Sequence, residues 1–264
     1  MVQRIPPTRP TRRPCRTATG VALLLASLCI VPSAPAQTGG SDANPSTASS
    51  ASGDTANRRQ EAAAKRLSDS VGIVHTMAAV PGMTPLLAQA HGIYIVPNFG
   101  RAALGVGAEG GSGVLMVRRA DGTWSNPAFY TIGGVSIGLQ AGAEGGPIAL
   151  VLMNDKAIDS FRKKNNFSLN ASAGLTVVNF SRMAQGSTAG DVVAWAGSKG
   201  LFGNAVTVGI NDIRFNPRLT DALYGKPTTA IAAIDSTEPN PHADALRKAL
   251  ANPPTPTGTG ARRP

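Results

Sequence analysis

Two glutamates occupy equivalent places in a repeated pentapeptide, and their spacing suggests acid–base chemistry. Gly-Ala-Glu-Gly-Gly stands at 107–111 and again at 142–146, each time ahead of an apolar run. If the two copies form related strands, Glu109 and Glu144 lie close together, and neighbouring carboxylates raise the pKa of one of them. In the alternative, both carboxylates accept backbone hydrogen bonds from the glycines beside them at a turn or rim. The sequence does not decide between the two.

Three further segments spell motifs of nucleotide-binding proteins or hydrolases, but their surroundings do not fit. Residues 105–110 spell G-x-G-x-x-G, which must open a helix to bind a dinucleotide, whereas more glycine and a β-type run follow here. Residues 134–138 spell G-x-S-x-G, which needs a following helix and a later histidine, as does the serine at 196–200. The one later histidine, His242, lies beyond the expected domain end. The sequence therefore predicts a protein that is not an enzyme.

The sequence has no histidines at the spacing expected of a metal site. His75, His91 and His242 are far apart in the chain, and no pair has the close spacing of a zinc site. The sequence predicts neither a metal site nor a cofactor.

The first 36 residues have the pattern of an export signal. A basic start is followed by an apolar run over 18–30 and by Ala34-Pro35-Ala36, so we expect cleavage after Ala36 and a periplasmic or outer-membrane location. Both cysteines, Cys15 and Cys29, fall in the removed segment, which excludes disulfides from the mature chain. Five arginines leave with it and reduce the formal charge of +10. The remaining mildly basic chain suits an acidic surface.

Aromatic side chains beside a lysine suggest contact with a membrane interface. Trp124 follows an Asp121-Gly122 turn, and Trp195 and Phe202 flank the segment 198–200. An indole ring at headgroup depth and an amine on a phosphate would suit such a surface. In the alternative, these aromatics fill the core of a domain with few other large side chains.

The elements that must position these residues change in type along the chain. Residues 37–56 are small and polar and predict a flexible linker. Residues 57–80 predict a helix with an apolar stripe (Ala63, Leu67, Val71, Val74 and Ala78), and 85–90 a second short helix. A strand at 93–96, closed by Pro97, precedes the glycine-rich copies.

The second half predicts short strands with short helices between them. Asp121-Gly122 predicts a tight turn, and Asn154 predicts the N-cap of a helix at 155–163. Strands are expected within 148–153, 167–180, 192–196 and 205–210, and a last helix at 217–223, ended by Gly225. The sequence predicts an α+β domain at 57–230: N-terminal helices, then a mostly antiparallel sheet or partly closed barrel with short helices. Residues 231–264 predict a largely disordered tail.

Several motifs in order along 84–161 give the chain a family resemblance. They are A-x-G-I-x-x-x-P at 90–97, G-x-G-x-x-G-G-S-G-V-L at 105–115, D-G-x-W-S-x-P at 121–127, G-x-S-x-G-x-Q at 134–140 and Leu152-Met153-Asn154 before a helix. A weaker match runs over 190–225. With these motifs the chain resembles the SYLF domain, also called the Ysc-type actin-binding domain.

The resemblance implies lipid binding without catalytic residues. Eukaryotic members bind phosphoinositides and in some cases actin filaments, and bacterial members are exported. In one branch a basic helix ahead of the domain docks on lipid, and Arg58, Arg59, Lys65 and Arg66 would do so here. Because the apolar stripe of this helix is mostly Ala and Val, we expect it to pack on the domain instead.

The favoured hypothesis is a non-enzymatic lipid-binding module of the cell envelope that binds anionic lipid and no nucleic acid. Its candidate lipid contacts are Arg101, Arg118, Arg119, Lys199 and Trp195. The alternative is a structural or assembly protein of the envelope, whose glycine-rich edge strands pair with a protein partner.

Overall fold

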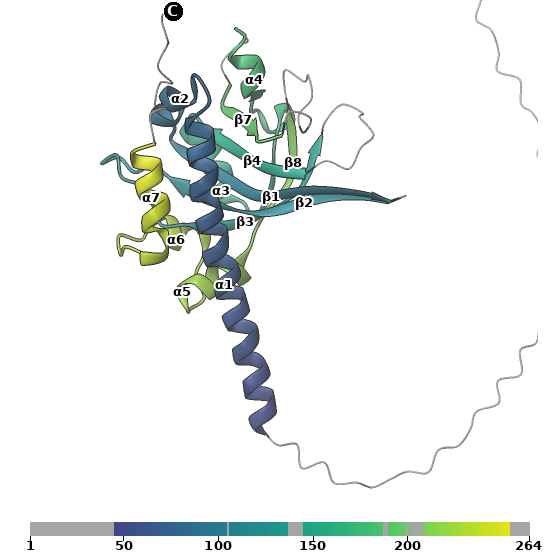
Figure 1. Ribbon diagram of the computed structural model, residues 1–264, viewed down its shortest axis with the longest axis vertical. Coiled ribbons are helices and arrows are strands. Elements are labelled where there is room, and N and C mark those ends of the chain that lie inside the picture. The colour runs from purple at the N-terminus through teal and green to yellow at the C-terminus, as the bar shows by residue number, and fades with distance from the viewer. Residues whose placement is uncertain are drawn as a thin grey trace, which may run out of the picture. The chain divides into compact units, whose positions relative to one another are not determined.

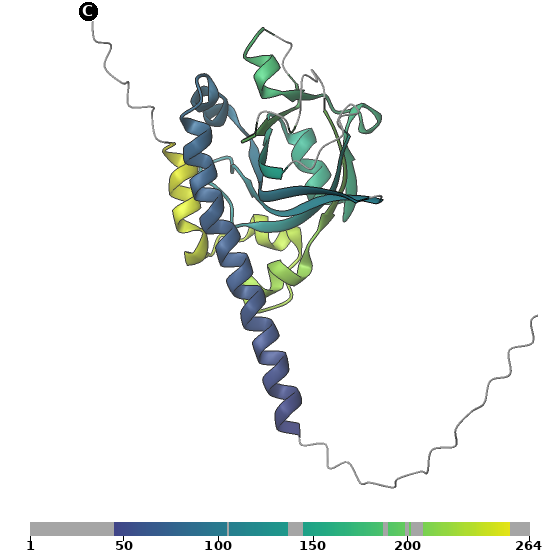
Figure 2. The same ribbon diagram turned by 45° about the vertical axis from the view of Figure 1, so that its right-hand side comes forward.

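An eight-stranded, mostly antiparallel sheet curls into a nearly closed barrel, and helices pack against both of its faces (Figures 1 and 2). The computed structural model describes residues 45–104, 106–136, 145–186, 190–198, 201 and 208–253. The predicted signal peptide at 1–36 lies outside these residues. The predicted fold class is confirmed.

The strands follow one another around the barrel in the order β5-β8-β3-β2-β1-β4-β7-β6, and the β6–β7 pair is parallel. Their bounds are β1 Gly92–Leu104, β2 Val106–Val117, β3 Ala128–Ser136, β4 Gly145–Leu152, β5 Asn166–Leu169, β6 Val177–Asn179, β7 Val192–Ala196 and β8 Gly209–Phe215. The backbone N–H of Val208, just before β8, donates to the carbonyl of Val177 in β6 at 3.0 Å. This contact brings the two ends of the sheet together.

The helices are distributed between the inside and the outside of the barrel. Their bounds are α1 Pro45–Ala78, α2 Met83–Gln89, α3 Asp155–Lys163, α4 Phe180–Met183, α5 Pro217–Tyr224, α6 Ala230–Asp235 and α7 Asp244–Ala251, with 3-10 turns at Ala171–Ala173 and Pro241–Ala243. Figure 2 shows α3 within the curl of the sheet, whereas α1 and α7 lie side by side on its outer face.

Side chains fill the inside of the barrel. Tyr94, Tyr130 and Phe161 form a ring cluster there, with the Tyr130 and Phe161 centroids 5.0 Å apart in an edge-on arrangement. The Tyr94 hydroxyl donates to the Tyr130 carbonyl at 3.0 Å, and the Tyr130 hydroxyl to the Phe161 carbonyl at 2.7 Å. Burial raises the pKa of both hydroxyls above the ordinary tyrosine value. These rings and the aliphatic side chains around them form a packed core.

The predicted apolar stripe of α1 packs on the domain, as expected. Ala63, Leu67, Val74 and Ala78 are buried, and the first three share a core with the outer face of the sheet and with α2, α5 and α7. The helix begins at Pro45, so the predicted linker at 37–56 is wrong for residues 45–56. Proline is favoured in the first turn of a helix, and after it this segment holds one glycine and no further proline.

Close backbone packing explains the repeated glycines. Gly100 in β1 pairs with Gly110 of the first copy on one side and with Gly145 of the second copy on the other. A Cβ at Gly110 would lie 2.7 Å from the Ile132 carbonyl oxygen, and one at Gly111 would lie 2.6 Å from the Asn98 carbonyl oxygen. Only glycine lets the neighbouring backbones approach this closely.

Pro97 does not close the first strand, which was the predicted boundary. β1 continues to Leu104, and its pairing with β4 changes register between Val96 and Phe99. Pro97 lies in this irregularity, one of the few positions where a sheet accepts proline, because no ladder hydrogen bond is lost there.

Other predictions from local turn and capping residues are confirmed. The turn at Asp121-Gly122 is confirmed: Gly122 has φ 84° and donates to the Arg119 carbonyl at 2.9 Å. The N-cap of α3 is also confirmed, because the Asn154 side chain accepts from the Ala157 N–H at 3.1 Å. The predicted last helix is α5, and Gly225 follows it with φ 66°.

Two predicted strands differ from the structure. The segment 167–180 divides into β5, a 3-10 turn and β6, because the Asn170 side chain caps the turn, and Phe180 begins α4 after the cap Asn179. The strand predicted at 205–210 is β8, shifted to Gly209–Phe215; residues 202–207 lie outside the described residues.

The predicted disordered tail at 231–264 is wrong up to Ala251. Leu246, Ala249 and Leu250 of α7 are buried against the α1 side of the sheet, and Ala233 and Ile234 of α6 are buried in the barrel core. The prolines at 239 and 241 interrupt the chain between these helices without preventing either from packing.

Candidate basic groove between α1 and α5

A groove of about 410 Å³ lies between the exposed part of α1 and the two ends of α5. Figure 1 shows α5 beside the lower half of α1, where α1 begins to extend past the sheet. The groove is lined by Ala56, Asn57, Arg59 and Gln60 from α1, and by Arg218, Asp221, Ala222, Gly225, Lys226 and Pro227 from α5 and the segment after it.

The caps of α5 fix the positions of two basic residues at this groove, Arg218 in the helix and Lys226 after it. The Asn216 side chain caps the helix by accepting from the Leu219 N–H at 3.2 Å, and Pro217 occupies the first turn, so Arg218 begins at a defined position. At the other end, the left-handed conformation of Gly225 turns the chain so that Lys226 lines the same groove. Arg59 comes from the turn of α1 that precedes buried Ala63.

The groove is a concentration of positive charge. Arg59, Arg218 and Lys226 are exposed, and within the part of the chain that the structure describes none of their side chains has a hydrogen-bond or ion-pair partner. The acid among the lining residues is Asp221, whose Oδ1 already accepts the Thr228 N–H at 2.7 Å. Guanidinium and ammonium groups in this arrangement can bind a phosphate or carboxylate from solvent.

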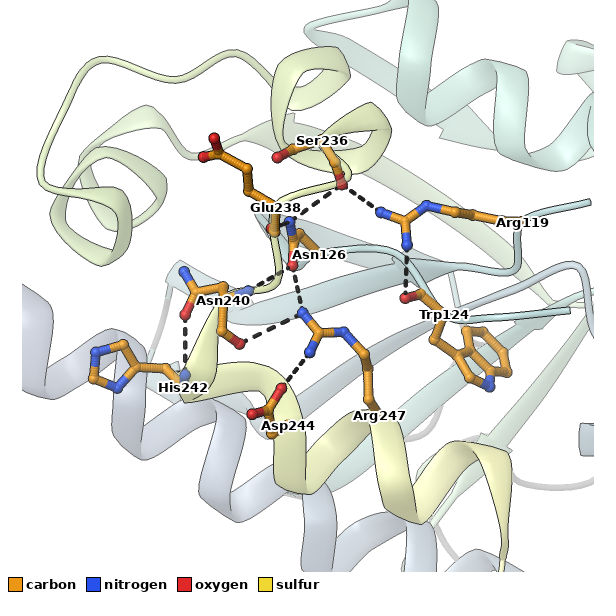
Figure 3. Close-up of polar contacts among 9 residues, drawn as sticks. All are labelled: Arg119, Trp124, Asn126, Ser236, Glu238, Asn240, His242, Asp244 and Arg247. Carbon is orange, nitrogen blue, oxygen red and sulfur yellow. Dashed lines mark hydrogen bonds and ion pairs between the residues drawn. The ribbon is translucent and has the colours of Figure 1, made fainter. Parts of the chain in front are cut away.

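Arg118 and Arg119, predicted as lipid contacts, make contacts within the fold. The Arg118 guanidinium lies 4.7 Å from the centre of the Trp124 ring, and its Nη2 donates to the Leu87 carbonyl at 3.1 Å. Arg119 donates from Nη1 to the Trp124 carbonyl at 3.3 Å and from Nη2 to the Ser236 carbonyl (Figure 3). Their contact with lipid stays a prediction.

The two tryptophans are core residues. Trp195, a predicted lipid contact, is 6% exposed and stands opposite Ala149 on β4; Trp124 is 2% exposed. Both belong to the core beneath the outer helices. The alternative interpretation of these aromatics, as core residues, agrees with this burial.

The remaining predicted residues lie at or beyond the limits of the described structure. Arg101 stands opposite Glu109 in the β1–β2 pairing, and the side chains of both are outside the description. Lys199 and Glu144 are outside the described residues altogether. The strands that hold the two pentapeptide copies are not neighbours, because β1 lies between β2 and β4.

Sequence reasoning missed Arg218 and Lys226. Their positions in the sequence were the available signal. Arg218 follows Pro217, which starts α5, and Lys226 follows Gly225, which ends it, so the backbone of both basic residues is fixed. Arg59 was noted only as one of several basic residues in the predicted N-terminal helix. Nothing in the sequence brings α1 next to α5.

Two of the enzyme-like motifs lie in strands. Residues 106–110 belong to β2 and 134–136 to β3, and neither described segment opens a helix. Among the described residues, no three His, Cys, Asp or Glu side chains are grouped as metal ligands. Within the same residues, no helix combines the length and apolar character needed to cross a membrane.

Comparison with known proteins shows a family match over the second half of the chain. Residues 133–252 match the family described as "Ysc84: Las17-binding protein actin regulator". The SH3 domain-containing YSC84-like protein 1 of Homo sapiens is 31% identical over 121 residues, covering 44% of this chain and 35% of the human protein. Protein YSC84 of Saccharomyces cerevisiae is 28% identical over 123 residues, covering 44% of this chain and 26% of the yeast protein.

The chain spans about a third or less of the length of these curated relatives. No solved structure matches it. The family match runs from β3 through α7 and so includes α5. It also includes α6 and α7, most of which lie beyond the domain end predicted at residue 230. Residues 133–252 therefore match the model of the Ysc84 (SYLF) family, and the chain is similar there to YSC84-like proteins at about 30% identity.

Proposed function

We propose that this protein binds anionic phospholipid surfaces at the basic groove between α1 and α5, without catalysing a reaction. The observation that carries the proposal is the convergence of Arg59, Arg218 and Lys226 on one hollow, where cations outnumber the single lining carboxylate, Asp221. Each lysine or arginine near an anionic membrane contributes about 1 kcal/mol to binding. Three of them support reversible, peripheral attachment.

The burial of the other candidate groups favours this groove as the contact. The apolar stripe of α1 and both tryptophans lie in the core, so attachment through them would require part of the domain to open. The groove needs no such change. The proposed setting is the periplasm or outer membrane, with phosphatidylglycerol as a suitable acidic lipid.

Charge reversal in the groove tests the proposal. For Arg218→Glu we expect about 25-fold weaker binding to phosphatidylglycerol vesicles at low salt, because one attraction is lost and one repulsion of similar size is added. Co-sedimentation of the full chain measures the binding, and phosphatidylcholine vesicles give the uncharged baseline.

Lys164→Glu is the matched control. Lys164 is exposed at the end of α3, outside the groove, and has no partner among the described residues, so the same charge change there should weaken binding less than about threefold. Equal losses in the two variants would contradict a role specific to the groove. Failure of the unmodified chain to prefer anionic vesicles would overturn the proposal.

A further inference from the structure

A second hollow, of about 620 Å³, adjoins the basic groove. It lies among the end of α5, α6 and the loop that leads to α7, and is lined by Leu223, Tyr224, Lys226, Pro227, Thr228, Ala232, Ser236, Glu238, Pro239, Asn240, Pro241 and His242. Its volume is in the range of small-ligand sites. Lys226 and Pro227 line both hollows, so the two form neighbouring compartments with a shared wall.

A buried asparagine holds the outer wall of this second hollow. Asn126 is 1% exposed, and its Nδ2 donates to the Glu238 carbonyl at 2.6 Å and to the Ser236 carbonyl at 3.3 Å (Figure 3). Its Oδ1 accepts the Asn240 N–H at 3.1 Å and a hydrogen bond from Arg247 Nη2. Three of these hydrogen bonds hold residues that line the hollow, so this wall is pre-formed, which lowers the ordering cost of binding.

The two compartments differ in charge. The groove has Arg59, Arg218 and Lys226 around a carboxylate that is already hydrogen-bonded. Beyond Lys226, the second hollow offers a mixed lining in which the side chains of Glu238 and His242 have no partner among the described residues. Figure 3 shows the Glu238 carboxylate directed away from Asn126. A carboxylate and an imidazole can accept hydrogen bonds from alcohol groups but would not favour a second anion.

This polarity matches one kind of molecule. We infer that the two compartments form a single site for a phosphate ester of a small alcohol, with the phosphate on the groove cations and the alcohol part in the second hollow beyond Lys226. Such a group is the glycerol phosphate unit of a phospholipid or a soluble ester of the same chemistry. The inference rests on the proposed function, and it adds that one ester molecule is bound in a built site.

Calorimetric titration of the full chain with glycerol phosphate and with inorganic phosphate tests the site. We expect glycerol phosphate to bind about tenfold more tightly, since the alcohol part adds one or two hydrogen bonds of ordinary strength in the second hollow. Equal affinities for the two compounds would overturn the inference.

A plug variant separates this hollow from the groove. Ala232 lines the hollow on α6, so Ala232→Trp should fill it and remove the tenfold preference while leaving the affinity for inorganic phosphate unchanged. The matched control is Ile231→Trp, because Ile231 is the neighbouring residue of α6, is 50% exposed and does not line the hollow. A preference retained in Ala232→Trp, with thermal unfolding as in the control, would count against the site.

Vesicle binding distinguishes this inference from the proposed function. If vesicle binding depends on Arg218 but the chain binds glycerol phosphate no more tightly than inorganic phosphate, the groove is a lipid contact and the single-ester site is wrong. If the preference is present but anionic vesicles do not bind, the site takes a soluble ester and the lipid proposal is wrong.

Discussion

At the scale of single residues, the D-G-x-W-S-x-P motif connects the sheet to the C-terminal segment through hydrogen bonds. Ser125 accepts the Val117 N–H at 2.9 Å through its hydroxyl and donates to the Asn126 carbonyl at 2.8 Å. Asn126 then binds the backbone of the loop before α7 (Figure 3). The motif stood out in the sequence, whereas its partners more than a hundred residues later became visible only in the structure.

Removing the Asn126 side chain should therefore destabilise the domain. Asn126→Ala removes the hydrogen bonds to the Glu238 carbonyl and from the Asn240 N–H, and we expect a loss of about 2–4 kcal/mol in the free energy of unfolding. Urea denaturation measures it, with Asn165→Ala, at an exposed site, as the control. A loss below about 0.5 kcal/mol would show that the C-terminal segment does not depend on these hydrogen bonds.

Asp191 gives the domain a specific response to acid. Its Oδ2 accepts the Thr176 N–H at 2.7 Å and its Oδ1 accepts from Asn154 at 2.7 Å, and the Thr176 hydrogen bond chiefly holds the pKa below the ordinary aspartate value. A lowered pKa in the folded state means that the carboxylate stabilises the fold above its unfolded-state pKa, about 3.9, and that this stabilisation is lost as the pH falls through the lowered value.

The free energy of unfolding should therefore fall more steeply below about pH 4 in the unmodified chain than in Asp191→Asn, which has no carboxylate to protonate. Urea denaturation at a series of pH values compares the two slopes. Identical slopes would mean that Asp191 has the same affinity for protons in both states.

At the scale of elements, some glycines are required by close packing and others are only tolerated, and composition alone does not distinguish them. A Cβ at Gly113 in β2 would lie 2.8 Å from side-chain atoms of Tyr94 and Val96 and closer still to the Ile95 carbonyl. Gly72 in α1 has nothing within 4 Å of the same atom. The first glycine is required by packing, and the second is tolerated in a helix.

Alanine at the two positions should have opposite effects. We expect Gly113→Ala to cost about 3 kcal/mol or more in the free energy of unfolding, because rigid backbone cannot move aside in the middle of the sheet. Gly72→Ala should stabilise the fold by about 0.5–1 kcal/mol through helix propensity. Denaturant unfolding measures both. A neutral Gly113→Ala would show that the sheet can relax at this point.

At the scale of the whole molecule, the lipid proposal and the assembly alternative respond differently to salt. Attraction between the groove and an anionic membrane is screened over about 10 Å at 0.1 M salt and about 3 Å at 1 M. We therefore expect vesicle binding to be largely lost in high salt. Co-sedimentation over a salt series measures this change.

The alternative, a structural protein of the envelope that pairs through its glycine-rich strands, predicts the reverse. Strand pairing depends on backbone hydrogen bonds rather than charge. A salt-insensitive oligomer in size-exclusion chromatography, together with no preference for anionic vesicles, would favour it over the lipid proposal. Export and cleavage after Ala36 stay predictions that N-terminal sequencing of the secreted or periplasmic protein can check.

Much of the fold could be predicted because its signals are local. Asn154 caps α3, Asp121-Gly122 makes the turn after β2, and Gly225 follows α5, each acting on backbone within a few residues. The apolar stripe of α1 and the strand signal at 93–96 likewise depend on neighbours in the chain. The packing of α7 was missed because the proline-containing segments on either side of this short helix suggested disorder, and only contact with α1 and the sheet makes its three apolar residues a buried face.

The sequence by itself therefore determined the fold class, most element positions, and a family resemblance that the comparisons confirmed for residues 133–252. Only the tertiary structure decided which basic and aromatic residues are available. Arg118 and Arg119 make hydrogen bonds within the fold and Trp195 is buried, whereas Arg59, Arg218 and Lys226 line one groove from distant parts of the chain. A residue's type gives its chemistry, but its partners depend on which segments pack together, and that packing is set by contacts far apart in sequence.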